Sequence, residues 1–150
     1  MDYLKPVLKK FQSQKAMIQD LIDYQIHENE NWIRQKIRDR WALGKKPDGS
    51  MIGLYSERNE DYAREKFSQN SSAGFGNVDL TLTGSLWKGI QISGFKDEYE
   101  VFSTDSKYEE IVDKYGEYNF NISETEKKIL FDRILVNILT DIMNKSYALL

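Results

Sequence analysis

The chain has 150 residues, of which 40% are hydrophobic and 30% are charged, and its formal net charge of -3 argues against a general nucleic-acid binder. It contains no cysteine, which excludes disulfides, zinc–cysteine centres, iron–sulfur clusters and thiol nucleophiles. No apolar run approaches the roughly 18 residues that a membrane-spanning helix needs, and the first residues lack the apolar core of a signal peptide, so we expect a cytoplasmic site of synthesis and no membrane partner.

The first part of the chain has the periodicity of an amphipathic helix. Between Leu4 and Ile26 the apolar residues recur mostly at spacings of three, four or seven. The pattern weakens from His27 to Asn31 and then resumes with Trp32, Ile33, Ile37 and Trp41. We therefore expect one long helix with a break, or two helices in series.

Turn residues follow this helical arm. Gly44 is suited to a left-handed helix cap, and the following KKPDGS has the residues that a tight turn prefers. Residues 59–67 (NEDYAREKF) predict a short helix, and the polar, glycine-rich residues 68–77 predict a flexible loop.

The stretch from Val78 to Leu82 alternates apolar and polar residues and therefore predicts a strand with one buried face. After it, Thr83 can cap a short helical turn, Gly84 permits a sharp change of direction, and Leu86 turns back into the core. We interpret these three residues as a structural corner. The alternation resumes around Ile92, and YEVFS at 99–103 predicts the return strand of a hairpin.

Two helices are predicted beyond the hairpin. SKYEEIVDKYG is a short helix that ends at Gly116. Ser123 and Glu126 have the spacing of a capping box and begin the last helix. That helix keeps apolar residues at helical spacing up to the C-terminus, so we expect it to be part of the core.

These elements predict an α+β fold. A long N-terminal helix and a C-terminal helix would pack on a small, mainly antiparallel sheet built from the stretches around Leu80, Ile92 and Val101. We expect a single domain over residues 1–150, with a helical arm at about 1–43 and an α+β body at about 44–150.

The residue types that usually carry catalysis are scarce. His27 is the one histidine, and it has no partner in the sequence that would make it a metal ligand or a general base. Glu109 and Glu110 are adjacent in a helical stretch and point in different directions, which is poor geometry for shared acid–base work. No phosphate-cradling loop or calcium loop is complete. We expect no catalytic residue, no cofactor and no metal site, and hence no enzyme.

Charge is distributed unevenly, with a basic segment at Arg34–Lys46 and an acidic segment at Asp97–Glu126. The basic segment also carries tryptophans, which are open to three interpretations: core packing, a protein interface or a nucleic-acid platform. Two oppositely charged surfaces can meet head to tail in an assembly. The residues expected at such an inter-subunit interface are Trp32, Arg34, Arg38, Arg40, Trp41, Glu109, Glu110 and Asp113.

The order of motifs resembles the neck or tail-completion proteins of tailed bacteriophages. The resemblance covers most of residues 34–145. It rests on DGxxIGxYS at 48–56, on Tyr62 and Lys66 in a Tyr-x-x-x-Lys helix, on VDLxLTGSL at 78–86, and on the STDxKY segment at 103–108 before the final helix. The sequence departs from the common pattern after the TG step, where Trp87, Lys88 and Gly89 precede Ile90.

The resemblance implies an architectural function. Copies of the chain would form a ring in the neck of the virion, between the head connector and the tail, with a channel for DNA. The partners would be other copies of the chain, other phage connector and tail proteins, and DNA that passes without sequence-specific binding. Assembly would take place in the cytoplasm of the bacterial host.

Two other classes of function stay open at this point. A small DNA- or RNA-binding protein would use the basic segment Arg34–Lys46, and its binding would weaken steeply with salt because phosphate contacts release counterions. An adaptor or inhibitor directed at one host protein would stay monomeric at any concentration.

Overall fold

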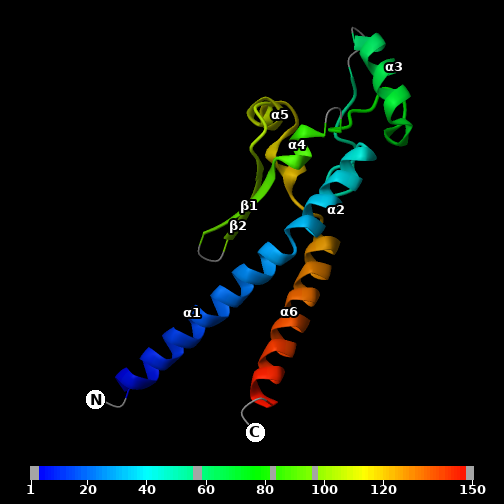
Figure 1. Cartoon of the computed structure of the whole chain (residues 1–150). Coiled ribbons are helices and arrows are strands. Elements are labelled where there is room, and N and C mark those ends of the chain that lie inside the picture. Colours follow the sequence, from blue (N-terminus) through cyan, green and yellow to red (C-terminus); the bar gives the residue numbers. More distant parts are fainter. Residues whose placement is uncertain (1–3, 56–58, 82–83, 96–97, 148–150) are drawn as a thin grey trace. The chain divides into compact units, whose positions relative to one another are not determined.

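The computed structural model describes residues 4–55, 59–81, 84–95 and 98–147 (Figure 1). The α-helices are α1 (Leu4–Glu28), α2 (Glu30–Ala42), α3 (Glu60–Gln69), α4 (Ser85–Lys88), α5 (Tyr108–Tyr115) and α6 (Glu124–Tyr147). Two short 3₁₀ helices, η2 (Ser71–Ala73) and η3 (Glu117–Phe120), and two antiparallel strands, β1 (Ile90–Phe95) and β2 (Glu98–Ser103), complete the described elements. The predicted α+β class is confirmed.

The chain forms two compact units. The first contains Met1–Asn29 and Lys128–Leu150, and the second contains Glu30–Lys127. The boundary near residue 30 coincides with the break between α1 and α2, so α2 belongs to the second unit rather than to the helical arm that we expected to extend to about residue 43. Helix α6 begins in the second unit and continues into the first.

The break between the first two helices lies at Asn29. Its backbone N–H still donates to the carbonyl oxygens of Gln25 (3.2 Å) and Ile26 (3.1 Å), and its side-chain Nδ2 donates to Gln25 O at 2.8 Å. The backbone and the side chain of Asn29 therefore both bond to carbonyl oxygens of the last turn of α1, where the helix ends. Two helices in series, one of the two predicted arrangements, is the observed one.

In the first unit, α1 and α6 are joined by a hydrogen bond from Asn137 Nδ2 to Gln25 Oε1, 2.8 Å long. Figure 1 shows the first turns of α1 and the last turns of α6 lying apart. Among the described side chains of α6, Ile134 is buried, whereas six other apolar residues are 43% to 63% exposed. The prediction that α6 belongs to the core is therefore wrong, because a two-helix unit has no third layer to cover it.

The core of the second unit is built on α2. Ile33, Ile37 and Trp41 lie four residues apart on one face of the helix, and all three are buried. Phe120 of η3 packs edge-on against Trp41 and Tyr108, with ring centroids 5.1 and 4.8 Å apart. The aromatic cluster thus ties α2 to α5 and η3.

The hairpin β1–β2 is the one pair of strands in the described residues, with Ile92 opposite Val101. Its open end, where Ile90 is opposite Ser103, is held by side chains: Arg34 Nε donates to Ile90 O at 2.7 Å, and Ser103 Oγ donates to Leu86 O at 2.7 Å. The predicted hairpin is confirmed.

The predicted strand at Val78–Leu82 is wrong in its described part. Residues 78–81 form no strand, and Val78, Asp79 and Leu80 are all buried, so the alternation does not separate a buried from an exposed face. The buried Asp79 carboxylate pairs with Lys66 Nζ and also accepts from Asn70 Nδ2 at 2.7 Å. A buried carboxylate needs such partners, and these contacts hold residues 78–81 against α3 instead of in a sheet.

The predicted corner is partly visible. Gly84 has φ +71°, a left-handed conformation that favours glycine, and it immediately precedes α4. Leu86 is buried, as expected. Thr83 lies outside the described residues.

The predicted helix ends are confirmed. Gly44 has φ +67° and donates to Trp41 O at 2.8 Å, and Gly116 closes α5. At the start of α6, Ser123 N donates to Glu126 Oε2 (2.7 Å) and Glu126 N donates to Ser123 Oγ (3.2 Å), which is the predicted capping box. The loop at 68–77 contains η2 and is held by Asn70, whose Nδ2 also donates to Ala42 O at 2.8 Å.

Candidate assembly interface

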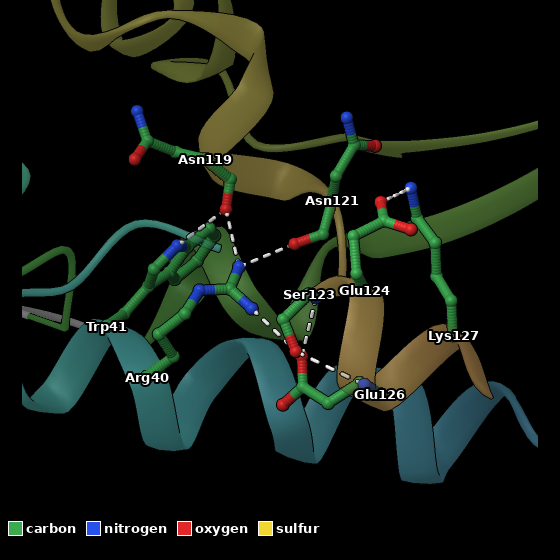
Figure 2. Close-up of polar contacts among 8 residues, drawn as sticks. All are labelled: Arg40, Trp41, Asn119, Asn121, Ser123, Glu124, Glu126 and Lys127. Atoms are coloured by element: carbon green, nitrogen blue, oxygen red, sulfur yellow. Dashed lines mark hydrogen bonds and ion pairs between the residues drawn. The ribbon is translucent and has the colours of Figure 1, made fainter. Parts of the chain in front are cut away.

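Two of the residues predicted at the interface, Arg40 and Trp41, lie in the interior of the second unit. Figure 2 shows Arg40 Nη2 donating to the carbonyl oxygens of Asn119 (2.9 Å) and Asn121 (2.6 Å). Its Nη1 donates to Glu126 Oε2 at 3.3 Å, and Trp41 Nε1 donates to Asn119 O at 3.0 Å. Arg40 is 9% exposed and Trp41 is 0% exposed, so both side chains are buried within the chain and are not surface contacts.

The guanidinium of Arg40 joins α2 to the chain that leads into α6. Burial lowers the pKa of Arg40 from its ordinary value, and the carboxylate of Glu126 opposes that shift. The oxygen of Glu126 that accepts from Arg40 is the same oxygen that accepts from the Ser123 N–H. One carboxylate oxygen thus serves both the ion pair and the helix cap.

The other residues predicted from the basic segment lie nearer the surface. Arg34 pairs with Glu30 at 2.6 Å while its Nε bonds β1. Arg38 is exposed and lies over the ring of Trp87, 4.5 Å from its centroid. Trp32 is half-buried beneath Lys36. Several side chains of the basic segment therefore make hydrogen bonds, ion pairs or ring contacts with other residues of the same chain.

The predicted acidic residues are on a different element. Glu109, Glu110 and Asp113 are all exposed on α5. Within the described residues, no ion pair joins them to Arg34 or Arg38. Among the residues that the structure describes, the ion pair that does join the basic and acidic segments is the interior one between Arg40 and Glu126, 3.3 Å long.

Helix α1 presents a surface that we did not select from the sequence. Five residues of its apolar stripe are 48% to 65% exposed: Leu4, Val7, Leu8, Phe11 and Ile18. The periodicity predicted the stripe but not its exposure, because periodicity shows that a face is apolar without showing what covers it.

Helix α6 exposes apolar residues on more than one side. Ile129 and Val136 are seven residues apart and share a side, whereas Phe131 and Leu135 share another, about 100° to 140° around the helix from Val136. Leu139 and Met143 are exposed as well. The exposed apolar residues of α6 therefore do not form a single stripe.

An acidic cleft of about 550 Å³ lies in the second unit, between the hairpin and η3. The residues that line it are Ser93, Glu98, Tyr99, Glu100, Glu117, Tyr118 and Asn121. Burial raises the pKa of the neighbouring Tyr108, and the carboxylates of Glu117 and Glu100 raise it further, which indicates a negative potential in this region. The acidic composition of residues 97–126 pointed to this region, but not to these side chains.

A second cavity, of about 210 Å³, lies beside the buried Lys66–Asp79 pair. Burial raises the pKa of Tyr55 at its wall, and the Asp79 carboxylate adds to the shift. The ammonium of Lys66 and the carboxylate of Asp79 neutralise each other in this pair. In the described part of the chain, no group of three or more histidine or carboxylate side chains is placed to hold a metal ion.

No helix among the described residues is both long enough and apolar enough to cross a membrane.

No protein-family model, curated protein or solved structure gives a significant match to this chain.

Proposed function

We propose that this chain is a structural virion protein of a tailed bacteriophage that assembles into a ring in the neck, between the head connector and the tail. One observation carries the proposal. The two long helices of the first unit, α1 and α6, expose apolar side chains along much of their length. Exposed apolar surface on this scale marks an interaction site. The resemblance of residues 34–145 to neck and tail-completion proteins supports the virion setting.

The energy of covering these helices indicates that both take part. A side chain of this size contributes about 2 kcal/mol when fully buried, so each half-exposed one has about 1 kcal/mol still to gain. Covering the α1 stripe alone gives about 5 kcal/mol, near the lower end of the roughly 4–15 kcal/mol that association costs. Covering both helices gives about twice that amount.

A ring requires two different surfaces on each copy, since a head-to-tail contact repeats around a closed circle. The chain has more than one candidate surface for such contacts, among them the stripe on α1 and the exposed apolar residues of α6. In the proposed assembly the partners are other copies of this chain and the adjoining connector and tail proteins. DNA passes through the central channel without sequence-specific contacts.

The proposal is tested by the molar mass of the purified full chain, measured by light scattering over a concentration series. We expect a discrete large oligomer for the natural sequence. Replacing Leu8 and Leu139 together by glutamine removes apolar contact from both helices and should lower the mass to that of a monomer at the same concentration.

The matched control is Ser13→Gln, which places the same side chain on the opposite face of α1, where it is exposed. It should leave the oligomer intact. A natural chain that stays monomeric at every concentration overturns the proposal, and so does an oligomer that the Leu8 and Leu139 substitutions leave unchanged.

A further inference from the structure

The exposed stripe of α1 has a one-sided charge environment. Residues 4–19 contain Lys5, Lys9, Lys10 and Lys15 and no aspartate or glutamate. Phe11 lies at the middle of the stripe and is 64% exposed. Of these lysines, Lys10 and Lys15 border the stripe, so the stripe fits a surface that combines apolar contact with negative charge.

The cleft between the hairpin and η3 has the complementary character. Its lining holds three carboxylates, those of Glu98, Glu100 and Glu117, and no basic side chain among the described residues. It also holds two tyrosines, of which Tyr118 is 46% exposed. Aromatic rings that accept an aromatic anchor are typical of the centre of a protein interface.

We propose that the first four turns of α1 from one copy dock on the acidic cleft of the next copy in the ring, with Phe11 as the central anchor. This inference rests on the proposed self-assembly and assigns the two surfaces that form the contact. Lys10 and Lys15, which border the stripe on either side, lie near the rim carboxylates, and the Phe11 ring contacts the tyrosines of the cleft.

The charges of the chain favour this occupant over a second α1. Two α1 helices laid together over residues 4–19 would bring eight lysines close together with no carboxylate to offset them. The cleft provides carboxylates instead. Because the donor helix and the acceptor cleft are different surfaces, every copy can give one arm and receive one, as a closed ring requires.

The absence of cysteine from the chain allows a direct cross-linking test with the full-length protein. Gln14→Cys lies close to Phe11 on α1, and Ser93→Cys lies in the cleft lining; both positions are exposed. When the two single-cysteine proteins are mixed and oxidised, we expect a disulfide-linked dimer that contains one copy of each.

The matched control mixes Gln14→Cys with Ser68→Cys, an exposed position on α3. That mixture should give at most a tenth of the product. Equal yields from the two mixtures, or no product with Ser93→Cys, overturn the docking assignment. A chain with both cysteines that forms only an intrachain disulfide also overturns it.

Charge reversal provides a second readout in the same light-scattering assay. Lys10→Glu with Lys15→Glu, or Glu98→Lys with Glu100→Lys, should each lower the molar mass at least two-fold, and all four substitutions together should restore it. Full-size oligomers from both reversed proteins overturn the docking assignment while the proposed ring stands. A natural chain that never assembles overturns the ring itself, and the docking assignment with it.

Discussion

Arg40 was predicted from the sequence to lie at a surface interface, but its side chain is buried in the second unit. Its guanidinium donates to two backbone carbonyl oxygens and to the Glu126 carboxylate (Figure 2). Sequence position alone gave no sign of this, because its three partners are about 80 residues away along the chain. A buried charge is stable only when such partners surround it.

We predict that Arg40→Met lowers the free energy of unfolding by about 3 kcal/mol, because the carboxylate and both carbonyl oxygens lose their donor in a mostly buried site. Urea denaturation followed by tryptophan fluorescence measures the change, since Trp41 lies in the same network. Arg64→Met is the matched control: Arg64 pairs with Glu60 on the exposed face of α3, where such a pair contributes less than about 1 kcal/mol. Similar losses from both variants would contradict the structural role of Arg40.

Local signals predicted the ends of elements better than their surroundings. The capping box at Ser123, the glycine caps and the hairpin depend on contacts within a few residues, and the structure confirms them. The alternation at Val78–Leu82 was misleading because Asp79 is buried by pairing with Lys66, a contact that no period of two encodes. Likewise, the apolar spacing in α6 predicted a core helix, but it does not show whether the covering surface belongs to the same chain.

The start of α6 provides a test at the scale of an element. Ser123→Ala removes the hydroxyl that accepts from Glu126 N, so we predict a loss of about 1 kcal/mol in the free energy of unfolding. Ser68→Ala is the control, since its hydroxyl donates to a carbonyl within α3 on an exposed face and alanine is the better helix former. If Ser123→Ala is as neutral as the control in urea denaturation, the cap does not stabilise α6.

At the scale of the whole chain, the second unit has a packed core, whereas the first is a pair of helices with most of its apolar side chains exposed. Such a pair has little to stabilise it in isolation, since helices in water depend on the packing of an apolar face. In the proposed ring, contacts with neighbouring copies would supply that packing. The sequence predicted the two long helices and the charged segments, but the candidate contact surfaces on α1 and the acidic cleft required the structure.

The measurement that tests the ring most directly is electron microscopy of the purified full-length chain in low-salt buffer. The proposed function predicts closed rings of uniform diameter with a central channel. The assignment of lysines to carboxylates predicts that these rings dissociate in high salt, because screening weakens contacts between exposed charges. Particles without a channel, open filaments, or single copies at all concentrations would contradict the ring.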